Sequence, residues 1–497
     1  MKLVPLAICG GLAALSLLWQ NQPSFDPWAW IVWGRQLTGL SAVPFGSASP
    51  TGWKPLPVLI NMPIALLGSA AAPIVWVWLV RTAALWCLVQ AWNLGKRAAG
   101  TPAAVGAVVL LALTPQAVYL VGGGISEVLV ALLLLAAVSC HLDDKPNSAW
   151  FALLAAALAR PEIMAAAGPY GLYMVWRRRI HVGWFVGPIA LAALLWASGD
   201  WIGYGKPFAV AQRAEAGAEP QRVQSALVPA FEILARSVTE IQMGVALIAL
   251  LTFAAAVKWR EPVGRTLGAL SLSVVGATVI ATQLGYPGVP RYMGPAFMLA
   301  SVLAGIGLGR FVSVQIGAAK LVAAVAVTLI GLAVALPSAI TRDRGGLRWY
   351  EARSDATEGL PALIDASGGR TALLACGTVA TYPPDQLTAA AYALDVHLAS
   401  GDKPDVPSMW RWEIANPELT PSAFVFLVHY PPADAAALRG LPLTRERLLA
   451  VVPAAANVVS DESVVSPIAN VGNWAAAQVR TPLQPECAAA VRASRTR

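Results

Sequence analysis

Residues 102–141 read PAAVGAVVLLALTPQAVYLVGGGISEVLVALLLLAAVSCH. This stretch contains one acidic residue, Glu127, and no Lys or Arg, and its two apolar runs lie on either side of the glycines at 122–124. A helix of about 20 apolar residues spans the hydrocarbon core of a bilayer. The stretch therefore predicts two consecutive membrane helices, at 102–121 and 126–141.

The rest of the chain has the same character. Its 497 residues are 57% hydrophobic and only 12% charged, with a mean hydropathy of +0.61, whereas soluble domains carry roughly 25% charged residues. The 19 Trp residues also suit the boundary between membrane and water. We expect a polytopic α-helical membrane protein of about 11 helices, with spans at 3–19, 74–94, 102–121, 126–141, 148–160, 163–176, 182–199, 241–257, 266–284, 293–309 and 318–338.

Basic residues fix the expected orientation. They lie in short clusters between alternate apolar runs, which accounts for the net charge of +8 without a nucleic-acid partner. Membrane proteins keep such clusters in the cytoplasm. Leu18-Trp19-Gln20-Asn21 lacks a small-residue cleavage site, so we expect the first helix to be uncleaved. These signals predict a multi-pass protein of the plasma membrane, with a cytoplasmic N-terminus and an extracytoplasmic C-terminus. The clusters are Lys2, Lys96, Arg97, Lys145, Arg177, Arg178, Arg179, Lys258, Arg260, Arg265, Arg310 and Lys320.

Two outer loops, 20–73 and 200–240, interrupt the predicted membrane domain at 1–340. The first is rich in Trp and Pro. Its apolar stretches, Trp28–Leu40 and Leu56–Leu67, are too modest to span a bilayer and suit helices that lie along its surface.

The last segment, 341–497, has more charge and shorter apolar runs. We expect it to form a small extracytoplasmic soluble α/β domain. Its predicted strands are Thr371–Cys376 and Ala423–Val428, and its predicted helices are Leu387–His397 and Ala433–Arg439. Cys376 and Cys487 both fall in this segment and can pair in an oxidising compartment. The other cysteines, Cys9, Cys87 and Cys140, lie in apolar runs as small core residues.

Ionisable residues gather at the expected outer ends of the helices. Placing an ionisable side chain inside or next to the membrane costs free energy unless the side chain is paired or hydrated. Ionisable residues at such positions therefore mark functional sites. Carboxylates beside several cations suit chemistry on an anionic lipid headgroup. The set comprises Asp26, Arg35, Lys54, Glu127, Arg160, Glu162, Lys206, Arg213 and Arg291.

Each of these residues also has a plainer interpretation, and the residues alone leave both open. Asp26 before Pro27 suits a helix N-cap as well as a base that takes a proton from a hydroxyl. Glu127 suits the first turn of a helix capped by Ser126, or a carboxylate that orients an acceptor or holds a cation. Arg160 could neutralise Glu162 or bind a phosphate.

Taken in order, these motifs resemble the GT-C superfamily of polyprenyl-phosphate-sugar-dependent membrane glycosyltransferases. That superfamily includes protein O-mannosyltransferases, the aminoarabinose transferase of lipid A, and arabinofuranosyl- and mannosyltransferases of actinobacterial envelopes, to which the Ala-rich, Lys-poor composition points. The stretches that carry the resemblance are Phe25-Asp26-Pro27-Trp28, Ser126-Glu127, Leu158-Ala159-Arg160-Pro161-Glu162, Tyr204-Gly205-Lys206-Pro207 and Pro290-Arg291-Tyr292.

The resemblance implies a GT-C-like fold and an inverting transferase. Such an enzyme moves a hexosyl or pentosyl group from a polyprenyl-phosphate donor to a hydroxyl of a cell-envelope glycan or lipid, at the outer face. Its partners would be the donor, a glycan or glycolipid acceptor and membrane lipid. The alternatives are a transporter or flippase of lipid-linked saccharide, and a non-catalytic envelope assembly protein.

The resemblance also implies residue roles. Asp26 matches the general base and Glu127 a second acid near the acceptor or a metal. Asp26 has no acidic neighbour, unlike the paired acids of some members, so metal dependence is open and a divalent cation is the one possible cofactor. The donor phosphate would be bound by Arg160, Lys206, Arg291, Tyr292 and Lys54, and the substrates by Trp28, Arg35 and Glu162.

Overall fold

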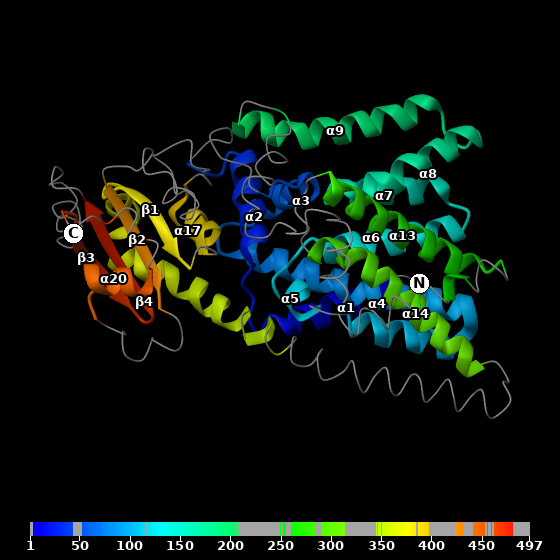
Figure 1. The fold of residues 1–497 in the computed structure, drawn as a ribbon, viewed down its shortest axis with the longest axis horizontal. Coiled ribbons are helices and arrows are strands. Elements are labelled where there is room, and N and C mark those ends of the chain that lie inside the picture. Colours follow the sequence, from blue (N-terminus) through cyan, green and yellow to red (C-terminus); the bar gives the residue numbers. More distant parts are fainter. Residues whose placement is uncertain are drawn as a thin grey trace.

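The computed structural model describes residues 3–42, 52–114, 117–204, 207, 249, 252–254, 260–284, 290–313, 344, 346–348, 350–383, 386–396, 423–430, 441–452, 455, 459 and 462–480. These residues are mostly helical. Figure 1 shows a bundle of helices at the right and a small sheet at the left. Helix α2 (Phe25–Leu37) stands between them and runs across the direction of the bundle helices.

The bundle helices coincide with predicted spans. They are α1 (Leu3–Ser16), α4 (Ala71–Ala112), α5 (Ala117–Gly122), α6 (Glu127–Leu142), α7 (Pro146–Ala157), α8 (Met164–Trp176), α9 (Val182–Tyr204), α13 (Pro262–Gln283) and α14 (Gly294–Ser313). Two short 3₁₀ helices, η1 (Pro161–Ile163) and η2 (Pro290–Met293), precede α8 and α14.

Four helical stretches in the described part of the chain are long and apolar enough to cross a membrane. The predicted span at 318–338 and most of that at 241–257 lie outside the described residues. The count of about 11 crossings therefore stays a prediction. The four stretches are Ala71–Ala112, Val182–Ile202, Pro262–Gln283 and Arg291–Arg310.

Helix α4 is two helices joined at a turn. Ala99 and Gly100 have non-helical backbone angles, and Gly100 has a φ of 78°. A Cβ on Gly95 would lie only 2.6 Å from the carbonyl oxygen of Ala103, so the chain doubles back closely here. The second half packs tightly on α14, because a Cβ on Gly106 would lie 2.5 Å from the Gly305 oxygen. Small residues of this kind allow membrane helices to approach one another.

The outer loop at 20–73 forms both expected helices, α2 and α3 (Pro55–Ala65). The structure shows that α2 is enclosed by protein, and its expected place along the membrane surface stays a prediction. Trp28 to Trp33 are almost completely buried by protein. Apolar residues occur all round the helix rather than on one stripe, and such a helix is enclosed on all sides.

The C-terminal part carries a four-stranded sheet of order β1-β2-β4-β3. The first two strands are parallel and the others antiparallel. They are β1 (Thr378–Tyr382), β2 (Ala423–His429), β3 (Val464–Val471) and β4 (Trp474–Arg480). Three short helices accompany the sheet, namely α16 (Gly369–Leu374), α17 (Leu387–Leu394) and α20 (Arg445–Val451).

Two of the C-terminal predictions are confirmed and one is wrong. Strand β2 and helix α17 lie where strand Ala423–Val428 and helix Leu387–His397 were expected. The predicted strand Thr371–Cys376 is helix α16 instead. A short buried apolar run cannot be assigned to strand or helix from its periodicity alone. The predicted helix Ala433–Arg439 lies outside the described residues.

The C-terminal part packs directly on the bundle. One continuous buried cluster joins Trp28 and Trp76 to Leu360 and Trp474. A helix at 350–366 leads from the bundle toward the sheet, and the Tyr350 hydroxyl lies 3.0 Å from the carbonyl oxygen of Gln22. The predicted boundary at 340 falls outside the described residues.

The cysteines follow the sequence in part. Cys9, Cys87 and Cys140 are free thiols. Cys376 is disulfide-bonded, whereas its predicted partner, Cys487, lies outside the described residues.

Candidate active site

The beginnings of five helices meet between the bundle and the C-terminal part. Asp26 lies in the first turn of α2, Lys54 immediately precedes α3, and Glu127 opens α6. Arg160 immediately precedes η1, and Arg291 lies in η2, just before α14. Ion pairs join Asp26 to Arg291, and Glu127 to both Lys54 and Arg160.

Asp26 forms an ion pair with Arg291, whose Nη2 lies 3.1 Å from Asp26 Oδ2. Residue 24, not Asp26, occupies the N-cap position of α2, so the capping interpretation of Asp26 is wrong. The Arg291 side chain keeps 30% of its surface exposed. Its Nε is buried and has no hydrogen-bond partner among the described residues. Arg291 therefore has donor capacity left beside a carboxylate.

Glu127 and Glu162 hold Arg160 from two sides. Arg160 Nη1 lies 2.9 Å from Glu127 Oε1, and Arg160 Nε donates to Glu162 Oε1 at 2.6 Å. Arg160 also donates to the carbonyl oxygen of Tyr292 at 3.2 Å and lies over the Tyr292 ring. Each nitrogen of the guanidinium thus has a protein partner. The contacts thus show the neutralisation of Glu162, and phosphate binding by Arg160 stays a prediction.

Glu127 is enclosed by these contacts and has no exposed side-chain surface. Its predicted role, as a second acid near the acceptor or a metal, stays a prediction. The carboxylate acts on its surroundings by holding cations in place.

Lys54 is the third cation of the cluster. Its Nζ donates to Ser126 Oγ at 2.9 Å and lies 4.0 Å from Glu127 Oε2. Burial lowers the pKa of Lys54 from its ordinary value, whereas the charges of Glu127 and Asp26 act in the opposite direction. Arg160 and Arg291 also act on Lys54 electrostatically. All five charged groups therefore share one electrostatic environment.

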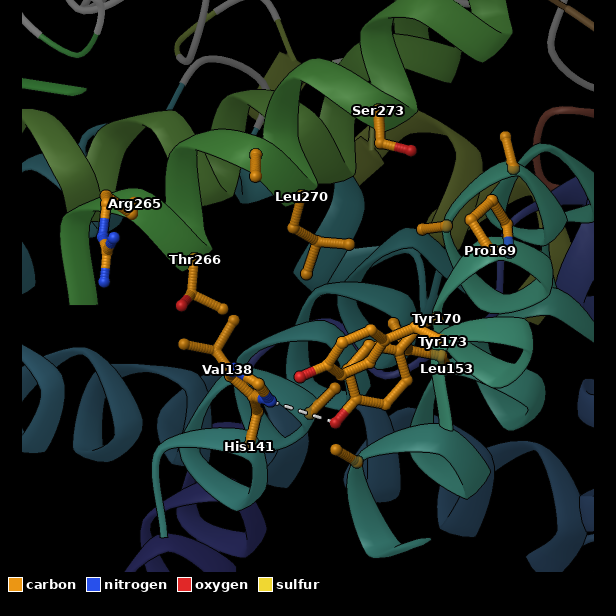
Figure 2. Close-up of a pocket in the computed structure, with 15 residues that line it drawn as sticks. Val138, His141, Leu153, Pro169, Tyr170, Tyr173, Arg265, Thr266, Leu270 and Ser273 are labelled. Atoms are coloured by element: carbon orange, nitrogen blue, oxygen red, sulfur yellow. Dashed lines mark hydrogen bonds between the residues drawn. The ribbon is translucent and has the colours of Figure 1, made fainter. Parts of the chain in front are cut away.

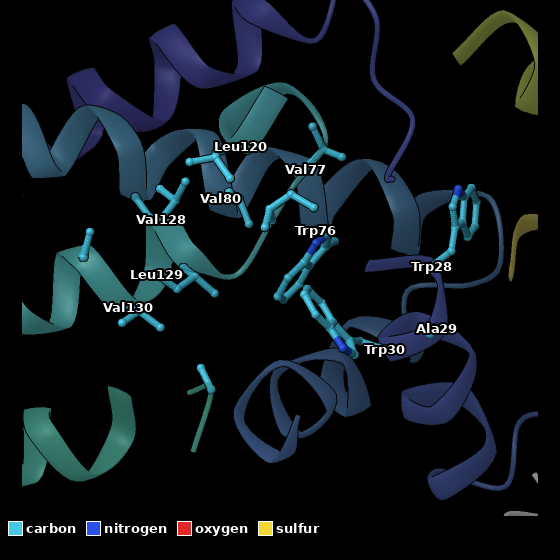
Figure 3. Packing of buried hydrophobic residues seen from close by; sticks show 14 of the residues in the cluster. Trp28, Ala29, Trp30, Trp76, Val77, Val80, Leu120, Val128, Leu129 and Val130 are labelled. Atoms are coloured by element: carbon cyan, nitrogen blue, oxygen red, sulfur yellow. The ribbon is translucent and has the colours of Figure 1, made fainter. Parts of the chain in front are cut away.

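Tryptophans and glycines form the wall behind the cluster. Lys54 Nζ lies 5.0 Å from the Trp30 ring centroid, and Trp30 packs edge-on against Trp76, as Figure 3 shows. Trp30 donates to the carbonyl oxygen of Gly52 at 3.0 Å. Gly52 has a φ of 70°, and a Cβ there would lie 3.5 Å from Asp26 Oδ1. The backbone thus approaches Asp26 closely where a side chain would be strained.

Arg35 and Trp28, expected to bind substrate, face the C-terminal part instead. Arg35 Nη2 lies 2.8 Å from Asp395 Oδ1, and the Arg35 guanidinium stacks on the Tyr392 ring. Trp28 packs on the same ring, with centroids 5.0 Å apart. Nine residues of helix separate Asp26 from Arg35, or about 13 Å. The polar ends of α2 therefore belong to two different contacts.

Asp395 is the centre of the second contact. Besides Arg35, it pairs with Arg370 at 3.1 Å. It accepts hydrogen bonds from the Ser41 hydroxyl and from the Ala42 backbone N–H, the latter at 2.9 Å. These four partners come from both ends of the chain, so Asp395 fastens the residues after α2 to the C-terminal part.

Sequence reasoning did not anticipate Ser126 or Gly52 as site residues. Ser126 was expected to cap α6, but it makes no such capping hydrogen bond and bridges Lys54 to Glu127 instead. The three glycines before it, of which Gly124 has a φ of 72°, were the available signal for an unusual turn. Lys206 and Arg213 lie outside the described residues.

A divalent cation at this site stays a prediction. In the described part of the chain no group of three or more His, Cys, Asp or Glu side chains is arranged to hold a metal. Asp26 and Glu127 each lie against cationic side chains.

No protein-family model matches this chain, and no curated protein matches it. Solved structures with similar backbones include ArnT from Cupriavidus metallidurans bound to undecaprenyl phosphate, at 13% identity and a TM-score of 0.48, covering 96% of this chain and 97% of that one. They also include the oligosaccharyltransferase of Archaeoglobus fulgidus in its apo form, at 12% identity and a TM-score of 0.47. AglB from the same organism, in complex with an inhibitory peptide and a dolichol-phosphate, is similar at 13% identity and a TM-score of 0.49. Each archaeal match covers 85% of this chain and 69% of the other.

These are likenesses of the backbone alone, since every identity is 12–13% and every TM-score lies below 0.5. The roles of individual residues do not follow from them, and the actinobacterial subtype stays a prediction.

Proposed function

We propose that this protein is an inverting membrane glycosyltransferase of the GT-C type. It moves a hexosyl or pentosyl group from a polyprenyl-phosphate donor to a hydroxyl of a cell-envelope glycan or lipid. One observation carries the proposal, namely that five helix beginnings and three cations converge around Asp26 and Glu127. Charges gathered in this way in a membrane protein serve binding and chemistry.

The convergence favours an anionic ligand. The formal charges of the side chains cancel, since Asp26, Glu127 and Glu162 oppose Lys54, Arg160 and Arg291. Each helix beginning adds partial positive charge, and such ends bind phosphate. The site as a whole therefore attracts the phosphate of a lipid-linked sugar.

Arg291 and Lys54 are the proposed ligands of the donor phosphate. Arg291 is partly exposed and has an unused buried donor. Lys54 sits beside it in the same electrostatic environment. Arg160 has its donors occupied by Glu127, Glu162 and Tyr292, so its proposed role is to hold the site together.

Asp26 is the proposed general base. When a donor phosphate binds Arg291, it competes with Asp26 for the guanidinium and leaves the carboxylate free to accept a proton. The acceptor hydroxyl oxygen attacks the anomeric carbon, and its proton passes to Asp26. The bond between the anomeric carbon and the phosphate oxygen breaks, and the lipid phosphate leaves with the electron pair. Arg291 and Lys54 stabilise the charge that develops on that oxygen. This single displacement inverts the anomeric centre.

The site is proposed to face the outer side of the plasma membrane, where arabinofuranose and mannose donors suit the envelope of an actinobacterium. The basic residues Arg97, Arg177 and Arg310 lie at the other ends of α6, α8 and α14, which begin at or next to the site, and this supports the orientation. A reporter fused after Arg497 should be active only outside the cytoplasm. Activity in the cytoplasm would reverse the proposed orientation.

The test of the function is Asp26→Asn, with Asp143→Asn as the matched control. Asp143 pairs with Arg97 at the opposite end of the bundle. In membranes supplied with labelled polyprenyl-phosphate sugars, Asp26→Asn should reduce transfer at least 100-fold without loss of protein. Asp143→Asn should transfer normally. Normal transfer by Asp26→Asn would eliminate Asp26 as the base, and movement of lipid-linked sugar across the membrane without transfer would favour a transporter.

A further inference from the structure

A cavity of 580 Å³ lies within the bundle, between helices α6, α7, α8 and α13. Figure 2 shows Leu270 and Ser273 on one side of the cavity and Tyr170 and Tyr173 across from them, with Val138 and His141 beside the tyrosines. This volume is in the range of pockets that enclose small organic ligands. None of the candidate active-site residues lines it.

The cavity lies toward the end of the bundle that is opposite to the candidate active site. Helix α6 begins at Glu127, in that site, and reaches the cavity with Val138 and His141 near its other end. The 14 residues between Glu127 and His141 correspond to about 21 Å of helix. His141 thus lies at the end of the cavity that is away from the candidate site, whereas Ala165 and Ala166, at the start of α8, lie nearer to that site.

The walls suit a hydrocarbon chain. Most of the lining side chains are those of Ala, Val, Leu and Pro. His141 Nδ1 and the Tyr170 hydroxyl lie 3.0 Å apart and hydrogen-bond to each other, so these two polar atoms satisfy one another. Next to the cavity, α7 and α8 expose Phe151, Leu172 and Tyr173, which are the side chains of a surface that faces lipid.

One end of the cavity carries a cation. Arg265 lines it from the first turns of α13 and is exposed. The nearby carboxylates have other partners, since Asp143 pairs with Arg97, Asp144 with Arg179, and Glu261 with Arg310 and the start of α13. Within the described residues Arg265 has no ion pair. The groove thus combines an apolar body with an uncommitted positive charge at its mouth.

We infer that this groove binds an anionic phospholipid of the leaflet at the basic end of the bundle. An acyl chain occupies the space between α6, α8 and α13, and the headgroup phosphate lies on Arg265. Basic residues at this depth attract anionic headgroups. The site is separate from the proposed transfer site and does not depend on it.

The inference is tested by native mass spectrometry of the purified full chain with two defined lipids, phosphatidylglycerol and phosphatidylcholine of the same acyl chains. Arg265→Gln removes the headgroup contact, and Ala166→Phe fills the groove. Arg177→Gln is the matched control, because Arg177 is an exposed basic residue at the same end that does not line the groove. The mid-point temperature of unfolding of each variant, with and without added lipid, provides a second readout.

Wild type and Arg177→Gln should retain phosphatidylglycerol about fivefold better than phosphatidylcholine, the effect of one arginine near a headgroup. Arg265→Gln should retain both lipids equally, and Ala166→Phe should retain neither. Equal retention of the two lipids by wild type would overturn the inference. So would an unchanged preference in Arg265→Gln, a result that remains decisive if Ala166→Phe does not fold.

Discussion

The two ends of the helix bundle use similar ion pairs in opposite surroundings. At the candidate active site, Arg160 and Glu127 lie 2.9 Å apart with 4% and 0% of their side chains exposed. At the basic end, Arg97 and Asp143 lie 2.6 Å apart with 44% and 45% exposed. Exposed pairs contribute little to stability, whereas removing one member of a buried pair leaves an uncompensated charge. The ion pairs at the two ends therefore differ in burial and not in distance.

The difference also indicates what each end is for. The exposed pairs are spread over the loops that join consecutive helices, and water satisfies them. The buried network joins the beginnings of helices that are far apart in the sequence, and each member depends on its neighbours. Matched substitutions at the two ends measure this contrast directly.

The largest difference is expected between Arg160→Ala and Arg97→Ala. Arg160→Ala leaves Glu127 and Glu162 without their shared partner and should lower the free energy of unfolding by about 3–5 kcal/mol. Arg97→Ala should cost less than about 1 kcal/mol. Thermal unfolding of both variants in the same detergent compares them. Equal losses would mean that the two ends do not differ in the way that burial indicates.

A smaller difference is expected when the acids are neutralised without change of shape. Glu127→Gln keeps the length of the side chain but removes the charge that Arg160 and Lys54 share, and should cost about 2 kcal/mol. Asp143→Asn should change stability by a few tenths of a kcal/mol. Sugar transfer should fall in Glu127→Gln alone, and full activity in that variant would contradict its role in holding the two cations.

Loss of the Asp395 contacts at the far end of α2 should lower the stability by an intermediate amount. Burial opposes the charge of Asp395, but the hydrogen bonds from Ser41 and Ala42 and the charges of Arg35 and Arg370 outweigh it, so the pKa of Asp395 lies below its ordinary value. Asp395→Asn keeps the left-handed backbone, which has a φ of 51°, because Asn tolerates it. The variant should lose about 1 kcal/mol at pH 7.

The pH dependence of that loss has a definite sign. A lowered pKa in the folded state means that the carboxylate stabilises the fold above the unfolded pKa of about 3.9. The contribution disappears as the pH falls through the folded pKa. The difference in unfolding temperature between wild type and Asp395→Asn should thus be constant from pH 7 to about 5 and close in stronger acid. A difference that widens in acid would show that Asp395 does not act as a carboxylate here.

A high salt concentration should produce the smallest change in stability, and it should distinguish the exposed ion pair from the buried one most clearly. At 1 M salt, charges further apart than about 3 Å are screened in water, whereas buried pairs are screened much less. Raising the salt concentration should erase the small cost of Arg97→Ala and leave most of the cost of Arg160→Ala. A parallel decline in both variants would place Arg160 in contact with solvent.

The sequence predicted the bundle helices well because an apolar run of sufficient length is a local property. It also predicted that Asp26, Glu127, Arg160 and Arg291 lie together, since alternate helix ends share one side of a membrane. It did not predict the contact of Arg35 with the C-terminal part, because the rotation of α2 directs that side chain toward Tyr392, 357 residues further along the chain. Substrate binding by Arg35 stays a prediction. The sequence did not predict the contact between Ser126 and Lys54. A serine before a helix can cap that helix or bind a distant lysine, and the Ser126-Glu127 motif is compatible with both.

The contact between Arg35 and Asp395 also bears on how the protein is made. The ribosome adds residues at about 5–20 per second, so Asp395 emerges roughly 20 to 70 seconds after Arg35. During that interval α2 has an uncompensated arginine and an uncovered tryptophan face. Chains that stop early keep that defect, and quality-control proteases can recognise it. Folding of the C-terminal part thus completes the surroundings of a helix that was among the first to be synthesised.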